Sequence, residues 1–173
     1  MINPFKKTYT PQELYLIEFL SSVRMFERLA PEELKLFLPY LYLRKYKENE
    51  VVFFRNDPSH AFYILKNGEV TLNIDIQDKF EVLSRITPGK GFGDNVLLKN
   101  TKRIYSAVVI SEDAEIYVIP QVNILEIFEE NVHIQAKMLT SLASVYNGYT
   151  ENLIKAYKSS SNFFNLAQVY IER

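Results

Sequence analysis

Residues 88–109 read Pro88-Gly-Lys-Gly-Phe-Gly-Asp-Asn-Val-Leu-Leu-Lys-Asn-Thr-Lys-Arg-Ile-Tyr-Ser-Ala-Val-Val109. Three glycines, at positions 89, 91 and 93, fall within five residues of a chain that has only five glycines. This glycine-rich segment connects a predicted strand at Gly91–Phe92 to a predicted helical turn over Asn95–Leu98. Backbone N–H groups exposed at the start of a helical turn favour an anion. The same residues also fit a plain glycine-rich turn between strands, followed by a solvated basic loop.

Charged side chains around this turn suit a phosphorylated sugar. The Asp94 carboxylate can accept hydrogen bonds from ligand hydroxyls, as carboxylates do with ribose. Lys99, Lys102 and Arg103 follow in a polar loop and can neutralise a phosphate.

Short strands are predicted on both sides of this segment, because apolar residues alternate with polar ones and β-branched and aromatic residues dominate. The eight predicted strands are Leu41–Tyr46, Val51–Arg55, Ala61–Leu65, Val70–Ile76, Phe80–Ile86, Gly91–Phe92, Ile104–Ile110 and Glu115–Ile119. Turn residues separate the strands about every ten residues, which is typical of an antiparallel barrel or jelly roll.

Helical patterns flank the predicted strands. One helix is expected to begin at Thr10-Pro11-Gln12-Glu13, with Thr10 as its N-cap, and another at Ala30-Pro31. Further helices are expected over Gln121–Glu129, residues 131–157 and Phe163–Ile171. The expected organisation is a helical lead-in over residues 1–39, a jelly roll over 40–130 and a helical segment over 131–173.

The long helix over residues 131–157 carries an apolar stripe with members about 3.5 residues apart, the spacing of a helix–helix seam. The stripe consists of Met138, Leu142, Val145, Tyr149 and Ala156. It predicts a homodimer formed through this helix. Packing of the same stripe on the chain's own barrel is an equally good interpretation.

Composition excludes several classes of protein. The chain has 173 residues, a formal net charge of −1 and no cysteine, which excludes disulfides, thiolate metal sites and a cysteine nucleophile. Its two histidines, His60 and His133, cannot make a multi-histidine metal site, and no catalytic triad or close carboxylate pair stands out. We therefore expect no enzyme activity. Without an apolar run of about 20 residues or a signal peptide, we expect a soluble, cytoplasmic protein that does not enter a membrane.

Residues 26–157 resemble the cyclic-nucleotide-binding domain of the catabolite-activator/FNR (Crp/Fnr) family of regulators. The motifs that carry the resemblance are Phe26-Glu-Arg-Leu-Ala-Pro-Glu-Glu-Leu34, Tyr46-Lys-Glu-Asn-Glu-Val-Val-Phe53, Phe62-Tyr-Ile-Leu-Lys-Asn-Gly-Glu-Val70 and Ile86-Thr-Pro-Gly-Lys-Gly-Phe-Gly-Asp94. The resemblance implies a mainly β fold with flanking helices: an eight-stranded antiparallel jelly-roll barrel, N-terminal helices and a long C-terminal helix that dimerises. It also implies a phosphate-binding cassette at 92–107, a candidate ligand in cyclic AMP or cyclic GMP, and no other cofactor.

Two departures from the family pattern preserve the fold. The family usually has glycine before the second strand and in the turn after it, where this chain has Asn49 and Asn56. Asparagine tolerates positive φ better than other side chains apart from glycine, so both turns can keep their shape.

Other departures affect the cassette itself. The residues that the resemblance places there are Gly91, Phe92, Gly93, Asp94, Asn95, Val96, Arg103, Tyr105, Ser106 and Ala107. Asp94 replaces the family's glutamate and is one methylene shorter. Matching Ser106-Ala107 to the family's small-residue–alanine pair puts Tyr105 in the place of the phosphate-binding arginine. Arg103 lies two positions earlier, on the same face of a predicted strand, and either reaches the site from another angle or is solvated.

The resemblance also gives Tyr149 and Thr150 as candidate contacts for a base. The chain ends at Arg173 after at most one short helix, so we expect no direct DNA reading, which needs a recognition helix and its partner helix. The resulting hypothesis is a small-molecule-sensing regulatory module that binds a small anionic ligand through a degenerate cassette and signals through its C-terminal helix. The alternatives are a dimeric scaffold that binds no ligand, or a transcription regulator without its DNA-binding domain.

Overall fold

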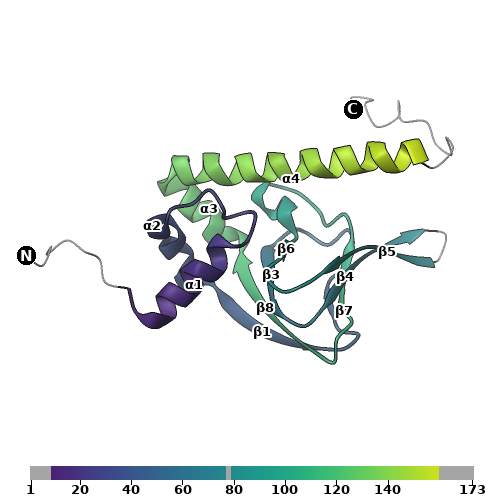
Figure 1. The fold of residues 1–173 in the computed structure, drawn as a ribbon, viewed down its shortest axis with the longest axis horizontal. Coiled ribbons are helices and arrows are strands. Elements are labelled where there is room, and N and C mark those ends of the chain that lie inside the picture. The colour runs from purple at the N-terminus through teal and green to yellow at the C-terminus, as the bar shows by residue number, and fades with distance from the viewer. Residues whose placement is uncertain (1–8, 77–78, 160–173) are drawn as a thin grey trace, which may run out of the picture. The chain divides into compact units, whose positions relative to one another are not determined.

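The computed structural model describes residues 9–76 and 79–159 (Figure 1). Its contacts divide the chain into two units, residues 1–141 and 142–173. The first unit holds the strands and helices α1 (Pro11–Ser21), α2 (Pro31–Leu34) and α3 (Gln121–Glu130). Helix α4 (Val132–Ser159) begins in the first unit and continues into the second. The helix expected over Phe163–Ile171 lies outside the described residues.

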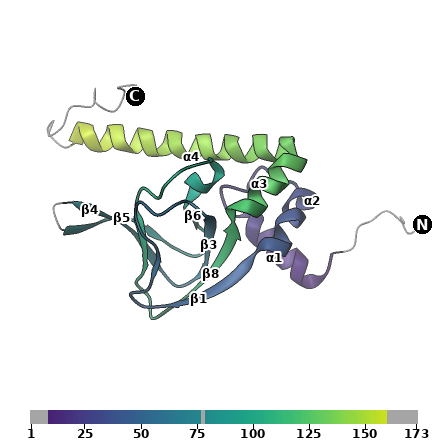
Figure 2. The same cartoon turned by 180° about the vertical axis from the view of Figure 1, so that it is seen from behind.

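The N-terminal helices begin where their capping residues predict. The Thr10 hydroxyl accepts a hydrogen bond from the Glu13 N–H at 3.2 Å, and the Glu13 carboxylate accepts one from the Thr10 N–H at 2.8 Å. Helix α2 has a single α-helical turn and continues as a 3-10 helix, η1 (Lys35–Tyr40), which contains Pro39. Helices α1, α2 and α3 lie together at one end of the strands, as seen from both sides in Figures 1 and 2.

Eight described strands form two four-stranded antiparallel sheets with the orders β1-β8-β3-β6 and β2-β7-β4-β5. Their bounds are β1 (Tyr42–Lys47), β2 (Val51–Phe53), β3 (Ala61–Asn67), β4 (Val70–Ile76), β5 (Lys79–Ile86), β6 (Gly91–Phe92), β7 (Ser106–Val109) and β8 (Asp113–Pro120). The predicted mainly β jelly roll with flanking helices is confirmed. Within the described strands, no ladder joins the two sheets, so the barrel is not closed by hydrogen bonds.

The two asparagine turns have the predicted conformation. Asn49 and Asn56 adopt φ values of 66° and 70°, in the left-handed region. The Asn49 N–H donates to the Val109 carbonyl, and the Asn56 N–H donates to the Arg103 carbonyl, each at 2.9 Å. These turns therefore connect the ends of β1 and β2 to the segment that contains the cassette.

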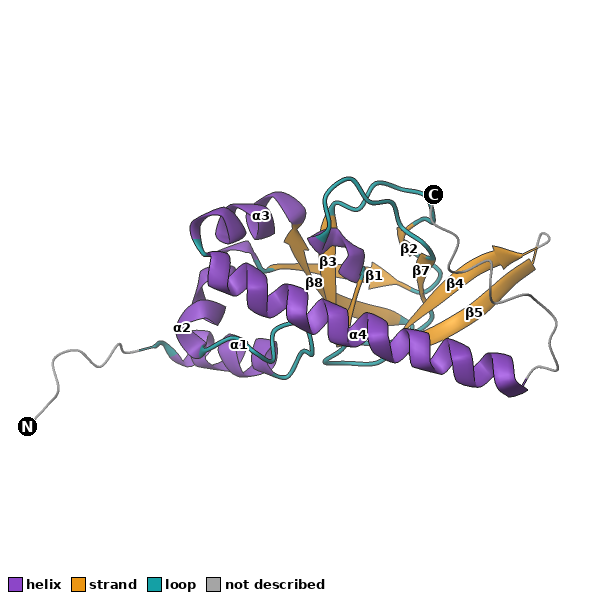
Figure 3. Ribbon diagram, turned by 90° about the horizontal axis from the view of Figure 1, so that it is seen from above, coloured by secondary structure: helices purple, strands orange, loops and turns teal. Residues whose placement is uncertain are grey.

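The core lies between the two sheets and is apolar. Its buried members include Phe53, Leu65, Val70, Phe92 and Ile116. The far part of the β4–β5 hairpin extends away from this core, as Figure 3 shows, and its Phe80 and Val82 side chains are exposed. None of the helices in the described ranges combines the length and apolar character needed to cross a bilayer.

Candidate functional site

The glycine-rich bend has the predicted geometry, displaced by one residue. Gly93 has φ 77° and caps a short 3-10 helix, η2 (Asp94–Leu97), whereas the sequence places the helical turn at Asn95–Leu98. Glycine is required at position 93 for two reasons. An L-residue is strained at this φ, and a Cβ here would lie 2.5 Å from Nη1 of Arg103.

Arg103 is inside the protein, with only 2% of its surface exposed. Its Nη1 donates to the Gly93 carbonyl at 3.0 Å and to Oδ1 of Asn95 at 3.2 Å. Its Nη2 donates to the Ala61 carbonyl at 2.5 Å, and its guanidinium carbon lies 4.3 Å from the centroid of the Phe53 ring. Of the two alternatives that the sequence left open, solvation is therefore wrong. Arg103 reaches the cassette but binds the cassette's own backbone.

The charge of Arg103 is held in a largely apolar environment. Burial lowers the pKa of Arg103 below its ordinary value, while the neighbouring Tyr63, Tyr105 and Asp94 oppose that shift. Nε of Arg103 is buried and has no hydrogen-bond partner among the described residues. Asp94 is itself 8% exposed, so an acidic and a basic side chain are both buried near the bend.

Four aromatic rings fill the space between the sheets beside this guanidinium. Tyr63 stacks on Phe92 with centroids 5.3 Å apart, and Phe53 contacts Tyr63, Phe92 and Tyr105 at 5.3, 6.0 and 5.8 Å. The Tyr105 hydroxyl accepts a hydrogen bond from the Gly93 N–H at 3.0 Å. The position that matches the family's phosphate-binding arginine is thus occupied by a ring whose hydroxyl binds a backbone donor of the cassette.

Arg103 and Tyr105 lie near each other for a different reason from the predicted one, which placed them on the same face of a strand. Strand β7 begins at Ser106, so the expected strand over Ile104–Ile110 is too long at its start. Arg103 and Tyr105 both reach Gly93, one at its carbonyl and the other at its N–H. Their shared contact with Gly93 brings the two residues together, whereas the alternation of side chains along a strand plays no part, because neither residue lies in β7.

The remaining cassette residues are buried or already hydrogen-bonded. Oδ1 of Asn95 accepts from the Ser59 hydroxyl at 3.0 Å, and the Ser106 hydroxyl accepts from the Arg55 N–H at 2.9 Å. Val96 and Ala107 are fully buried. These side chains support the shape of the bend. Lys99 and Lys102 are exposed, as the solvated-loop interpretation predicts.

The two candidate base contacts belong to the second unit. Tyr149 is 59% exposed, and its ring centroid lies 6.1 Å from that of Tyr146. The Thr150 hydroxyl donates to the Tyr146 carbonyl at 2.9 Å, within its own helix. In the first unit, Met138 of the predicted seam is completely buried within the single chain.

Neither histidine joins a cluster of potential metal ligands within residues 9–76 and 79–159. The described residues contain no group of three or more histidine, aspartate or glutamate side chains that could hold a metal ion. Nε2 of His133 lies 3.2 Å from the Glu33 carboxylate, which also accepts two hydrogen bonds at 2.8 Å from Lys137.

Sequence reasoning missed Phe53, Tyr63 and the carbonyl of Ala61. Phe53 and Tyr63 lie on predicted strands, where aromatic residues are ordinary core residues. No sequence signal distinguishes an aromatic residue that fills the site from one that fills any other part of a core.

Comparison with known proteins identifies the family. The model of the cyclic nucleotide-binding domain matches residues 43–131. The chain belongs to the cyclic nucleotide-binding domain family. Among characterised family members, the cyclic AMP receptor protein of Thermus thermophilus is 34% identical over 93 residues, which is 53% of this chain and 43% of that protein. A cAMP-dependent protein kinase regulatory subunit of Mycosarcoma maydis is 30% identical over 104 residues, which is 59% of this chain and 20% of that one.

Solved structures share this fold. The catabolite activator protein of Thermus thermophilus superposes with a TM-score of 0.66 at 26% identity, over 78% of this chain and 63% of that one. The sensor domain of the transcriptional regulator DNR from Pseudomonas aeruginosa superposes with a TM-score of 0.68 at 19% identity, over 82% and 95% of the two chains. The chain spans less than half the length of the two characterised relatives named above.

Proposed function

We propose that this chain is a small-molecule-sensing regulatory module without catalytic activity, and that its own side chains close its cassette to ordinary cyclic nucleotide binding. The observation that carries the proposal is the position of Arg103. Its guanidinium donates to the Gly93 and Ala61 carbonyls instead of facing an open site. The cassette is therefore degenerate in a specific sense: a cation is present, but its N–H groups already donate to backbone carbonyls of the same chain.

The hydrogen bonds of Arg103 set the affinity that a cyclic nucleotide can reach. To bind a phosphate in the usual way, Arg103 must release the Gly93 and Ala61 carbonyls. Hydrogen bonds to a charged group contribute about 1.5–3 kcal/mol each, so releasing two costs about 3–6 kcal/mol. At about 1.4 kcal/mol per factor of ten, affinity falls by roughly a hundredfold to ten-thousandfold relative to an open cassette.

Tyr105 closes the same site from the other side. Its hydroxyl accepts the hydrogen bond of the Gly93 N–H, so this N–H is not available to a bound anion. Its ring packs against Phe53 with centroids 5.8 Å apart, so displacing it would disturb the aromatic cluster between the sheets. A neutral hydroxyl also does not supply the charge of the family's arginine.

The output of the module is proposed to pass through the helix over residues 131–157, which would pair two copies of the chain as a homodimer. A ligand changes such an output only by the difference between its affinities for two helix arrangements. The alternative, a dimeric scaffold that binds no ligand, is favoured by the four rings that fill the space between the sheets.

Isothermal titration calorimetry with cyclic AMP and cyclic GMP tests the closed cassette. We expect no saturable binding to the natural chain below about 1 mM, and a measurable gain for Tyr105→Arg, which restores the family's cation. Tyr105→Phe is the matched control, because it keeps the ring and removes only the hydroxyl on the Gly93 N–H. Binding of either nucleotide to the natural chain with a Kd below about 10 μM would overturn the proposal.

A further inference from the structure

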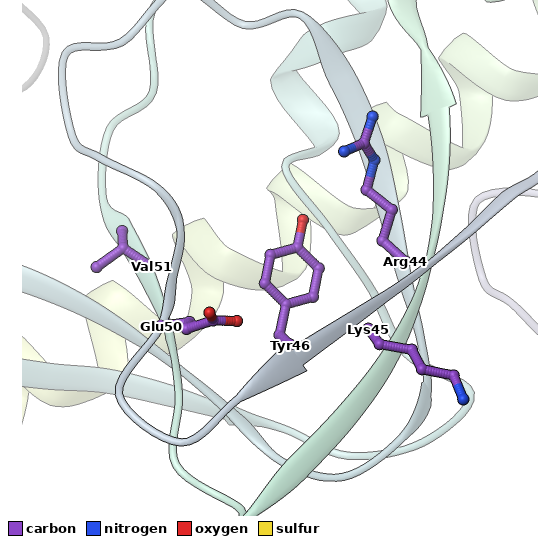
Figure 4. A pocket seen from close by; sticks show the side chains of 5 residues that line it. All are labelled: Arg44, Lys45, Tyr46, Glu50 and Val51. Atoms are coloured by element: carbon purple, nitrogen blue, oxygen red, sulfur yellow. The ribbon is translucent and has the colours of Figure 1, made fainter.

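A polar pocket opens between strands β1 and β2, away from the glycine-rich bend. It has a volume of about 480 Å³ and is lined by Arg44, Lys45, Tyr46, Glu50 and Val51. Figure 4 shows that the side chains of Arg44 and Tyr46 extend to the same side of β1, while Lys45 extends to the other side. All five residues belong to the first unit.

The register of β1 explains this division. Arg44 and Tyr46 lie opposite Ile116 and Ala114 of β8, both of which are buried in the core between the sheets. Directly opposed residues of an antiparallel pair share a face, so Arg44 and Tyr46 lie on the inner face of their sheet. Lys45 lies on the outer face, with its Nζ 3.6 Å from the Glu115 carboxylate.

Arg44 is an unpaired cation on that inner face. Its guanidinium makes no hydrogen bond or ion pair with any residue in the described part of the chain, and the side chain remains exposed to solvent. Arg55 and Arg85, by contrast, pair with the Asp75 and Glu69 carboxylates at 2.8 and 3.1 Å. Because a guanidinium presents five N–H donors in a planar fork, Arg44 has the geometry for a carboxylate or a phosphate.

Tyr46 and Glu50 complete the pocket. The Tyr46 ring packs against the core cluster, and burial raises the pKa of its hydroxyl, so this group remains a neutral donor at neutral pH. Glu50 is held in place, because its Oε2 accepts the Lys47 N–H at 2.8 Å. Its negative charge disfavours a bare inorganic anion and favours a ligand that also carries a hydrogen-bond donor.

We propose that this pocket binds a metabolite-sized oxyanion, a carboxylate or a phosphate, with Arg44 as its counter-charge and the Tyr46 hydroxyl as a second donor. The site is separate from the cassette and does not depend on whether the cassette is closed. Tyr46 connects it to the interior, since the charge of Arg44 acts on both Tyr46 and Tyr63, and Tyr63 lies beneath Arg103. Occupancy at Arg44 therefore acts on the same aromatic cluster that holds the cassette shut.

An amide-resolved NMR titration with three probes tests the site: inorganic phosphate, succinate and O-phospho-L-serine, each against sodium chloride at equal ionic strength. We expect saturable shifts centred on Arg44, Tyr46 and Glu50, tightest for O-phospho-L-serine because its ammonium group can pair with Glu50. Comparing phosphate with succinate shows which oxyanion the site prefers. Shifts confined to residues 91–95 would place binding in the cassette and overturn the proposal.

Two cationic residues of β1 provide matched variants, one inside the pocket and one outside it. Arg44→Gln is expected to weaken binding by at least about tenfold, because it removes a charge-assisted contact. Lys47→Gln removes a positive charge of the same strand that does not line the pocket: Nζ of Lys47 lies 2.6 Å from the Asp113 carboxylate at the surface. This variant is expected to change binding by less than about twofold, as exposed charges do. Equal losses in the two variants would indicate non-specific attraction and overturn the proposal, as would the absence of any saturable shift. A cyclic nucleotide titration of the same samples reports separately on the cassette.

Discussion

Replacing Arg103 by lysine tests whether its guanidinium holds the cassette shut. The substitution keeps the positive charge and removes the planar fork. In the natural chain the fork reaches the Gly93 carbonyl at 3.0 Å and the Ala61 carbonyl at 2.5 Å, from two different nitrogens. A lysine ammonium is a single point of charge and cannot reproduce both contacts in this geometry.

The expected loss follows from those contacts. Two hydrogen bonds from a charged donor contribute about 3–6 kcal/mol together, and an ammonium group can recover one of them. We therefore expect Arg103→Lys to lower the free energy of unfolding by about 1.5–3 kcal/mol, the contribution of the one hydrogen bond that is lost. For a chain of this size each kcal/mol corresponds to about 2–4 °C in Tm, so Tm should fall by roughly 3–12 °C.

Urea unfolding followed by circular dichroism, together with thermal melts, measures this loss. Arg85→Lys is the matched control, because the Arg85 side chain is 66% exposed and pairs with Glu69 at the surface. Its free energy of unfolding should change by no more than about 0.5 kcal/mol. If Arg103→Lys were as mild as Arg85→Lys, the guanidinium would not be held by the interior carbonyls, and the explanation for the closed cassette would fail.

Three further predictions concern the bend, the pH response and the helix. In the urea assay, Gly93→Ala should lower the free energy of unfolding by about 2–4 kcal/mol, because strain at φ 77° adds to a clash with the guanidinium of Arg103. Gly89→Ala is its control: the φ is 82°, but the space around the added Cβ is open, so the loss should be only about 1 kcal/mol. Burial would raise the pKa of Glu33, but hydrogen bonds from Lys137 and the backbone hold this pKa below its ordinary value. The ionised Glu33 therefore stabilises the folded chain fully at a pH above the ordinary pKa of glutamate, and this stabilisation is lost as the pH falls through the lower pKa of the folded state. Glu33→Gln should therefore cost about 1–2 kcal/mol at pH 7 and progressively less below about pH 4 in urea titrations, and a difference that did not shrink in acid would contradict this account. Sedimentation should show a dimer at tens of micromolar and a monomer for Tyr149→Glu, whose side chain is exposed in the single chain; a natural chain that sediments as a monomer would remove the dimer.

Local patterns in the sequence predicted most of the fold. Thr10 and Glu13 form the capping box that their spacing indicates, and Asn49 and Asn56 adopt the positive φ that their turns require. Such features depend on the backbone preferences of a few adjacent residues. The strand ends were less well predicted. Ile104 and Tyr105 continue the alternation of a strand in the sequence, yet β7 begins only at Ser106 and the Tyr105 hydroxyl accepts a hydrogen bond from the Gly93 N–H.

The chemistry of the cassette was only partly accessible in this way. The sequence identified Gly93, Arg103 and Tyr105 as the residues that decide it, but left Arg103 either solvated or directed at the site. The partners that settle this question are the carbonyl of Ala61 and the ring of Phe53, about forty and fifty residues away along the chain. No periodicity within a strand encodes a contact over such a separation.

Residue order alone thus determined the jelly roll, its turns and the absence of cysteine chemistry, since each depends on short-range conformational preferences or on composition. Only the tertiary structure decided that Arg103 points inward and that Arg44 faces a pocket without a partner. The physical reason is that a charge can be buried only where hydrogen-bond donors and acceptors surround it, and the whole fold decides which groups these are. Those groups come from strands that are distant in the sequence and meet only when the two sheets pack together.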